Sequence, residues 1–268
     1  MNQIRPAAVA GAFYPGNGQV LSRDLDALLE SAHPSHGPLP KALIVPHAGY
    51  IYSGPIAASA YQRLAQGRGT IKRVLLLGPA HRVPVHGLAL PEADHFATPL
   101  GLVAIDQAGS NAIRDLPQVL VSAAAHAMEH SLEVQLPFLQ KVLGEFSLIP
   151  LVVGDTSAEA VAEVLERLWG GPETLIVISS DLSHYLPYAV AQRIDEQTTH
   201  MILNLKTGIN HEQACGGTPV NGLLLAAQRH GLNPELLDLR NSGDTAGDPD
   251  HVVGYASFAF VDGSPHAH

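Results

Sequence analysis

The stretch LIVPHAGYIYSG, residues 43–54, decides the fold that we expect this chain to adopt. In it, a short run of apolar residues stops at a proline, and His47 follows at once. Two later stretches repeat this plan: RVLLLGPAHR brings His81 after an apolar run, and TLIVISSDLSHY does the same for His184. Such runs are typical of strands buried on both faces of a parallel sheet. Because ligands bind beyond the carboxyl ends of these strands, we expect the three imidazoles to converge.

Apolar runs alternate with segments of helical periodicity along most of the 268 residues, which indicates an α/β fold. We expect a single domain over residues 1–268, in which helices flank a central mostly parallel or mixed sheet, with a disordered tail at 262–268. The expected strands lie at 41–45, 73–77, 87–90, 103–105, 119–121, 147–153, 174–178, 234–240 and 252–260. The expected helices lie at 20–31, 56–65, 106–116, 128–144, 158–169, 188–205 and 223–230. Pro55 is expected to start the second helix and Pro137 to kink the fourth.

Composition excludes several classes of protein. No apolar run approaches the length of a membrane span, and the first eleven residues lack the pattern of a secretory signal. A single cysteine allows no internal disulfide and suits a reducing cytosol, so we expect a cytoplasmic protein. The formal net charge of −10, without a cluster of Lys and Arg, gives no electrostatic basis for binding nucleic acid.

The candidate metal ligands are the histidines that follow strands and the one cysteine. Neutral imidazole is the commonest metal ligand, although a single loop histidine is more often simply hydrogen-bonded. Cys215 precedes two glycines and a predicted helix start, a setting that lowers a thiol pKa and favours thiolate. The alternative is a small buried side chain, the usual fate of a free cysteine. Both interpretations of Cys215 stay open on the residues alone.

Other residues near these stretches have candidate roles beside the metal. Asp181, three residues before His184, is suited to orient an imidazole or to cap a helix. The run AHAMEH matches an HxxEH metalloprotease pattern, but a five-residue match carries little weight in a chain with fifteen histidines. From this region we retain Glu129 and His130, together with Tyr50, as candidates that line the pocket. The nucleotide-binding patterns GxxxxGK[ST] and GxGxxG and the hydrolase pattern GxSxG do not occur.

Six motifs in order, AGAFYPG, VPHAGYIYSG, LLGPAHR, EHSLEVQLPFL, SSDLSHY and CGGTPVNGLL, closely resemble the Memo family. Its bacterial members are called AmmeMemoRadiSam system protein B, and the resemblance extends over residues 5–260. Memo proteins are similar to class III extradiol dioxygenases, which hold Fe(II) with two histidines and a glutamate and use a further histidine as acid/base. The resemblance therefore implies a single Memo-like domain with a dioxygenase-like pocket.

Carried over motif by motif, the resemblance assigns a role to each of five residues. His47 and His81 correspond to the metal-ligating histidines, His184 to the acid/base and Asp181 to its companion. Cys215 stands where the dioxygenases have their glutamate. A thiolate in place of a carboxylate makes the site softer, which suits copper or zinc and still allows iron. We expect one transition metal ion, with iron or copper favoured over zinc.

Three functions remain open at this point. The first is a metal-dependent redox enzyme acting on an unknown small molecule or peptide. The second is a non-catalytic module that uses the pocket to bind a metal, a peptide or a protein. The third is a zinc-dependent hydrolase, because mixed Cys and His ligands also occur at catalytic zinc. The family name further implies a radical-SAM protein and an AMME-type protein as partners.

Overall fold

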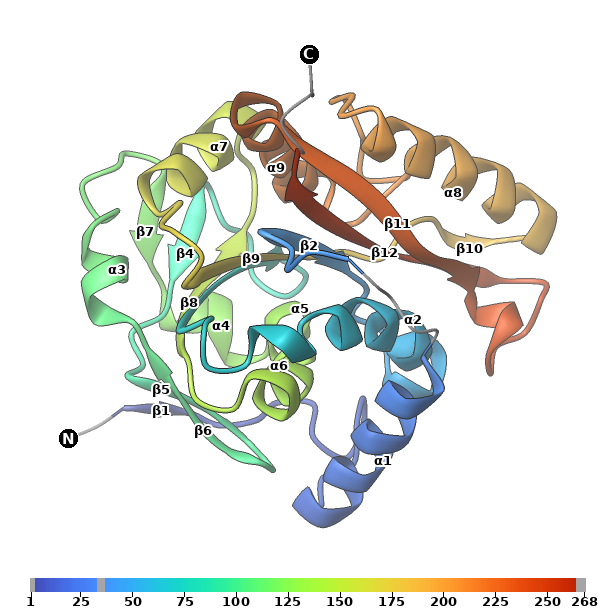
Figure 1. Ribbon diagram of the computed structural model, residues 1–268, viewed down its shortest axis with the longest axis horizontal. Coiled ribbons are helices and arrows are strands. Elements are labelled where there is room, and N and C mark those ends of the chain that lie inside the picture. Colours follow the sequence, from blue (N-terminus) through green and yellow to red (C-terminus); the bar gives the residue numbers. More distant parts are fainter. Residues whose placement is uncertain (1–2, 33–36, 264–268) are drawn as a thin grey trace.

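The computed structural model describes residues 3–32 and 37–263, which form a twelve-stranded mixed sheet flanked by helices (Figure 1). The central strands run parallel in the spatial order β6-β8-β3-β9-β2. Their bounds are Gly101–Ile105 for β6, Ser147–Val153 for β8, Arg73–Pro79 for β3, Thr174–Ser179 for β9 and Ala42–Val45 for β2. The carboxyl ends of β2, β3 and β9 therefore lie side by side.

Further strands, most of them in antiparallel pairs, extend this core on both sides; the β1–β5 and β4–β7 pairs are parallel. Beyond β2, the long strand β12 pairs with β2, β10 and β11. Beyond β6 come β5 and then β1, while β4 pairs with β8 and β7. Their bounds are Ile4–Arg5 for β1, Leu88–Leu90 for β4, His95–Thr98 for β5, Val119–Val121 for β7, His184–Leu186 for β10, Leu232–Asn241 for β11 and Val252–Asp262 for β12.

Two helical layers bury the faces of the sheet. Helices α1, α2 and α6 cover one face, and α7, α8 and α9 cover the other (Figure 1). Each face of the sheet has its own hydrophobic core, and alternate residues of a central strand point into one core or the other. In β2, Leu43 and Val45 pack with the first layer of helices, and Ala42 and Ile44 pack with the second. The helices are α1 Gly18–Ser31, α2 Tyr50–Arg63, α3 Gln107–Asn111, α4 Ala123–Ala127, α5 His130–Glu133, α6 Leu136–Leu143, α7 Ala158–Arg167, α8 Tyr188–Leu203 and α9 Gly217–His230.

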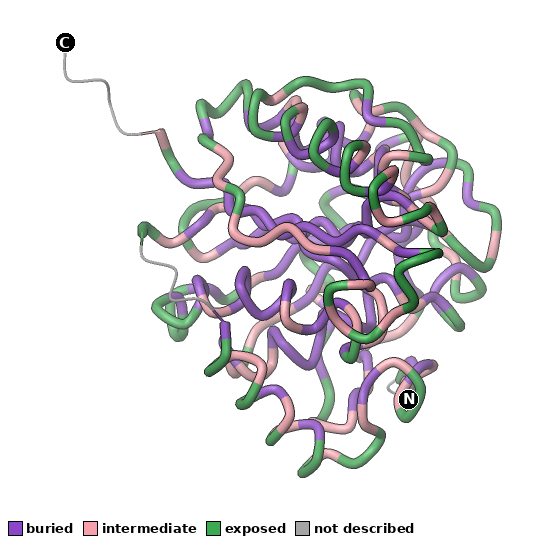
Figure 2. Tube along the Cα trace, turned by 90° about the vertical axis from the view of Figure 1, so that its right-hand side faces the viewer, coloured by how far each residue is buried: buried purple, intermediate pink, exposed green. Residues whose placement is uncertain are grey.

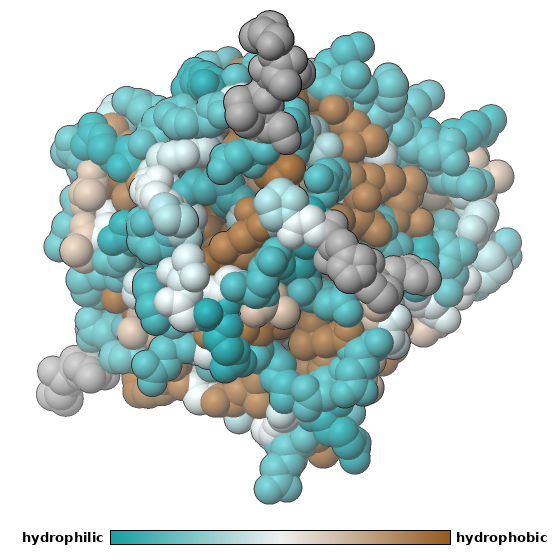
Figure 3. Space-filling model, in the orientation of Figure 1, coloured by the Kyte–Doolittle hydropathy of each residue, from teal (hydrophilic) through white to brown (hydrophobic). Residues whose placement is uncertain are grey.

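The surface views agree with this division. In Figure 2 the central strands are almost entirely buried, whereas exposed residues gather on the outer helices and the loops. Figure 3 shows hydrophilic residues over most of one face, with apolar residues reaching the surface in patches. No helix within the described ranges is long and apolar enough to cross a bilayer.

The structure confirms the expected α/β fold with a mixed sheet between helices, and it corrects several boundaries. Helix α2 begins at Tyr50, so Pro55 lies inside the helix instead of at its start. Pro55 cannot bond to the carbonyl of Ile51, but Ile51 is exposed, where water can satisfy that carbonyl. The helix expected at 128–144 divides into α5 and α6, and Pro137 lies in the first turn of α6. Asp262 still belongs to β12, and residues 264–268 of the expected disordered tail lie outside the described residues.

Candidate metal centre

Three histidines meet beyond the carboxyl ends of the central strands. His47 follows β2, His81 follows β3, and His130 opens α5. One ring nitrogen from each lies within 4.8 Å of the other two, the one such group of possible metal ligands found among the described residues. Helix α5 can approach β3 because Gly78 has no side chain: a Cβ there would lie 2.8 Å from Oγ of Ser131. The structure brings His47 and His81 together as expected, but the third member of the group is His130 and not His184, which was expected to converge with them.

The hydrogen bonds around His47 fix which of its nitrogens carries the proton. The hydroxyl of Ser179 donates to the carbonyl of Ser131 at 2.6 Å, so its oxygen can only accept from other groups. It accepts from Nε2 of Gln135 at 2.8 Å and lies 2.9 Å from Nδ1 of His47. Nδ1 of His47 therefore carries the hydrogen, and Nε2 presents a lone pair.

The orientation of Gln135 is fixed in turn by the core. Its Oε1 accepts from the hydroxyl of Tyr61 at 2.8 Å, and its Nε2 also donates to the carbonyl of Pro46 at 2.9 Å. Gln135 and Tyr61 are both fully buried. Burial, reinforced by the neighbouring His81, holds the pKa of His47 well below its ordinary value. His47 is thus a neutral imidazole with a defined tautomer.

Glu129 fixes the tautomer of His81. Its Oε1 lies 2.8 Å from Nδ1 of His81, and its Oε2 accepts from the backbone N–H of His81 at 2.6 Å. Burial alone would raise the pKa of Glu129, but these bonds and one from the backbone of Ser131 lower that pKa to about 2. An ionised carboxylate only accepts, so Nδ1 of His81 donates and Nε2 is the nitrogen left available to a metal. The same arrangement of carboxylate and imidazole orients metal-bound histidines elsewhere.

His130 packs against both other rings. Its ring centroid lies 4.6 Å from that of His81, nearly parallel to it, and 5.4 Å from that of His47. Burial lowers the pKa of His130, which keeps this ring neutral as well. Its Nδ1 is buried without a hydrogen bond, although Oε1 of Glu129 lies 3.5 Å away. His126, the first residue of the HxxEH pattern, is apart from this group because its Nε2 lies 2.8 Å from the carbonyl oxygen of Ala89.

Asp181 and Cys215 also lie close to His47. Oδ1 of Asp181 accepts from the backbone N–H of His47 at 2.7 Å, and its Oδ2 lies 4.0 Å from Nε2. Sγ of Cys215 is 3.4 Å from the same Nε2, yet Cys215 is outside the three-histidine group. Burial raises the pKa of Asp181 and, together with the charge of Asp181, raises that of the Cys215 thiol to about 12. The expectation that the start of α9 lowers the pKa of Cys215 is therefore wrong, because desolvation and a nearby carboxylate outweigh the helix.

The three histidines open into a cavity of about 610 Å³. His184 also lines it, from β10, where the register against β12 shifts between His184 and Leu186. Between them Tyr185 has a φ of 57°, the left-handed region that side chains seldom adopt. Such a bulge re-aims neighbouring side chains, and bulges and backbone strain both concentrate at functional sites. Tyr50 lines a neighbouring cavity instead, and its hydroxyl donates to the carbonyl of Val134 at 2.8 Å.

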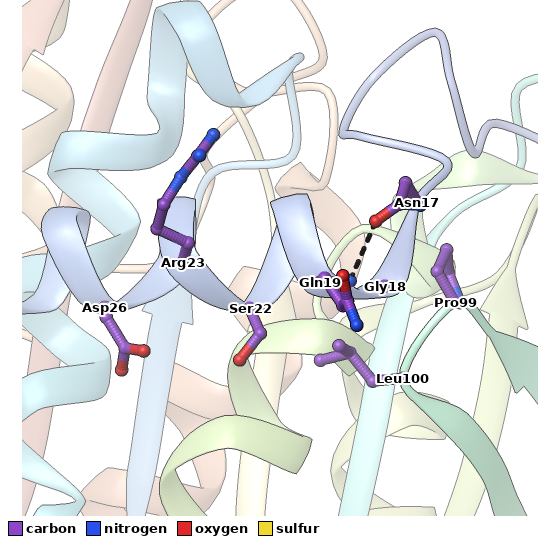
Figure 4. A pocket seen from close by; sticks show the side chains of 8 residues that line it. All are labelled: Asn17, Gly18, Gln19, Ser22, Arg23, Asp26, Pro99 and Leu100. Atoms are coloured by element: carbon purple, nitrogen blue, oxygen red, sulfur yellow. Dashed lines mark hydrogen bonds between the residues drawn. The ribbon is translucent and has the colours of Figure 1, made fainter.

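A second surface cavity, of about 860 Å³, carries no comparable chemistry (Figure 4). It lies between the first turns of α1 and the turn at Pro99 and Leu100. The side chain of Asn17 caps α1 by accepting from Gln19 and Val20, and Lys141 bonds both Ser22 and Asp26. The polar groups there have structural partners, so the histidine cavity is the better candidate site.

Sequence reasoning missed the residues that hold the histidines in place. Ser179, Gln135 and Tyr61 gave no signal, because each is an ordinary core or strand residue until the fold brings them together. The motif EHSLEVQ does contain Glu129, His130 and Gln135. The one available sign of their role was that these polar residues stand at positions that the fold buries.

Comparison with known proteins places the chain among relatives of nearly equal length. A family model described as "Memo-like protein" matches residues 5–259. A MEMO1 family protein of Aquifex aeolicus is 38% identical over 97% of this chain and 100% of its own. One from Sulfurisphaera tokodaii is 33% identical, again over 97% of this chain and 100% of its own. Among solved structures, uncharacterized protein JW3007 from Escherichia coli K12 shares the fold, with a TM-score of 0.50, 14% identity, and coverage of 82% of this chain and 99% of that one.

Proposed function

Because this chain belongs to the Memo-like protein family and brings neutral imidazoles to one point, we propose that it binds one transition metal ion and performs redox chemistry there. The observation that carries the proposal is the pair of hydrogen bonds that place the ring proton of His47 and of His81 on Nδ1; we call these two interactions the tautomer locks. Ser179 and Glu129 each accept a hydrogen bond from Nδ1 of a histidine, so Nε2 is the nitrogen that His47 and His81 can offer to a metal. Metal ligation needs this nitrogen to be unprotonated.

The donor distances support a shared ion. Nitrogen and sulfur donors bound to one tetrahedral ion at about 2.05 and 2.3 Å lie roughly 3.5 Å apart. Sγ of Cys215 lies 3.4 Å from Nε2 of His47, which fits this spacing. We therefore propose His47, His81 and Cys215 as the ligands, with His130 facing the ion from the cavity. Two nitrogen donors on one ion lie roughly 3.3 Å apart, so the three histidines, whose ring nitrogens lie within 4.8 Å of one another, form the alternative ligand set and must move closer together to share an ion.

Iron or copper, when bound, supplies one-electron chemistry to a molecule in the cavity. The protein's own groups do the remaining work. Asp181 holds the backbone of His47, Glu129 holds His81, and His184 stands at the cavity wall where its imidazole can take or return a proton of the substrate. Tyr52 and Tyr255 supply further walls of that cavity. Because Cys215 replaces a hard carboxylate ligand, we propose copper or iron ahead of zinc.

Elemental analysis of protein purified anaerobically without a histidine tag tests the proposal. We expect near-stoichiometric iron or copper in the wild type, and a large loss in His47→Asn, His81→Asn and Cys215→Ser. His200→Asn, on the exposed side of α8, is the matched control and should keep its metal. His130→Asn separates the two ligand sets, because metal loss there but not in Cys215→Ser would assign the third site to His130.

Oxygen consumption by the metal-loaded protein with a panel of catechols tests the redox step. Turnover that disappears in His184→Asn while the metal content stays unchanged would support the proton-transfer role. Metal contents that are identical in the wild type and the His47 and His81 variants would refute the proposed centre.

A further inference from the structure

A second cavity reaches the candidate centre from the opposite side of His81. Its volume is about 540 Å³, and it lies among the loops after β3 and β8 and the segment that leads into α9. His81 is the one residue that lines both this cavity and the one containing His184. Its potential metal donors are His81, His86, Asp155, His211 and Cys215. We call it the donor cavity, and the other the substrate cavity.

Cys215 opens toward the donor cavity and not toward the substrate cavity. The residue lines the former and is absent from the walls of the latter. At the same time its Sγ lies 3.4 Å from Nε2 of His47. The thiol therefore joins the donor cavity to the candidate centre.

The imidazole of His211 is set to receive a cation. Its Nδ1 lies 3.2 Å from the carbonyl oxygen of Cys215, which can only accept, so Nδ1 carries the hydrogen. Nε2 is thus the nitrogen available to a cation, and His211 is exposed. At the rim, Nδ1 of His86 lies 3.6 Å from Oδ2 of Asp155, and both side chains are almost fully exposed. The backbone bonds from Gly87 to Asp155 and from Asp155 to Val85 hold the two loops together.

We infer that the metal ion reaches its site through the donor cavity, from His86 and Asp155 at the rim to His211 and then to Cys215. The inference rests on the proposed metal centre. A hydrated cation must exchange water for protein ligands, and a series of carboxylate, imidazole and thiol donors lets it do so in steps of increasing softness. The substrate cavity carries the cationic Arg82 in its wall beside the carboxyl groups of Asp181 and Asp248, whereas the wall of the donor cavity contains Asp155 and neither Lys nor Arg. Separate routes leave the substrate cavity free for an organic molecule.

Stopped-flow loading with zinc tests this route. Zn²⁺ is supplied as a complex with a chromophoric chelator, so that its transfer is followed by the colour change; zinc has no redox chemistry to confuse the signal. We expect the double variant His86→Asn/His211→Asn to load at least tenfold more slowly than wild type and to reach the same final stoichiometry. His251→Asn, an exposed histidine of the substrate cavity, is the matched control and should load at the wild-type rate.

Each other outcome overturns a defined part of the argument. Loading of the double variant at the wild-type rate refutes the route while leaving the proposed centre intact. Slow loading of His251→Asn with normal loading of the double variant assigns entry to the substrate cavity. A lower final stoichiometry in the double variant makes these residues part of the binding site instead of its approach. If the wild type takes up no stoichiometric zinc and also contains no iron or copper in the elemental analysis, the centre is refuted and, with it, the route.

Discussion

Replacing Ser179 with alanine should damage both the stability of the fold and the affinity for metal. The hydroxyl makes three buried interactions: it donates to the Ser131 carbonyl and accepts from Gln135 and from Nδ1 of His47. Each buried hydrogen bond contributes about 1 kcal/mol net, and a donor left unsatisfied costs about 1–3 kcal/mol. We therefore expect Ser179→Ala to lower the free energy of unfolding by about 3 kcal/mol or more. At 2–4 °C per kcal/mol, the melting temperature should fall by roughly 6 °C or more.

The same substitution frees the His47 ring to adopt the other tautomer. Removing the group that orients a metal-bound histidine lowers affinity by about 10- to 100-fold. Urea denaturation measures the first effect, and competition with a chelator of known affinity measures the second. The control is Ser257→Ala, because Ser257 is fully buried but its Oγ has no hydrogen-bond partner. That variant should lose less than about 0.5 kcal/mol, as expected where no interaction is removed.

Two results would refute this reasoning. If Ser179→Ala lost no more stability than Ser257→Ala, the hydrogen bonds of Ser179 would not hold the core together. If stability fell but metal affinity stayed the same, the tautomer of His47 would not depend on Ser179.

Three further predictions follow from the other titratable groups of the site and its surroundings. Glu129→Gln keeps the size of the side chain but removes the charge opposite His81, so metal affinity should fall by about 10- to 100-fold in the chelator assay; an unchanged affinity would contradict the role of Glu129. The pKa of Cys215, raised to about 12, keeps the thiol protonated at neutral pH, so metal must displace a proton. Affinity should then rise about tenfold per pH unit between pH 6.5 and 8 in wild type but not in Cys215→Ser, and parallel pH profiles would exclude the thiolate ligand. Burial raises the pKa of Asp195 to about 6, so its contribution to stability is present below about pH 4 and lost as pH rises through 6. Asp195→Asn should therefore equal wild type in urea at pH 4 and exceed it by about 3 kcal/mol at pH 7, and a constant difference would contradict the shift.

The sequence predicted the buried centre of the sheet better than its edges. The strand expected at 147–153 is β8 with the same bounds, and the one at 174–178 is β9 with a single residue added. These strands are covered on both faces, so every residue between their ends is apolar and the run is unmistakable. Strands β1, β5 and β10 were missed because polar residues interrupt them, so they form no apolar run, whereas the equally short β7 was predicted from the run VLV. No local pattern marks the pairing of the missed strands.

The candidate site was predictable where a ligand follows a strand and not where it depends on distant contacts. His47 and His81 each follow a buried strand, so the topology alone brings them together. His130 instead depends on the position of α5, which is fixed by the N-terminal segment. Arg5 forms a buried ion pair with Glu133 and donates to the carbonyl of Glu129 at 2.7 Å. These contacts span more than a hundred residues, and the sequence gives no sign of them. The radical-SAM and AMME-type partners and the cytoplasmic location stay predictions.

The two tautomer locks connect metal affinity with the stability of the fold in unequal ways. Ser179 reaches His47 because the register of β2 against β9 pairs Val45 with Ser179, and its partners Gln135 and Tyr61 are core residues. Loss of the His47 lock therefore disturbs the core as well as the site. Glu129 holds His81 from a loop, and the side chain of His81 is 29% exposed. Glu129 is itself buried and accepts from the backbone N–H groups of His81 and Ser131, so its loss should destabilise the loop after β3 and the start of α5 as well as the metal site. The interactions of Glu129 thus connect metal affinity with one loop and one helix start, whereas those of Ser179 and Gln135 connect it with the core.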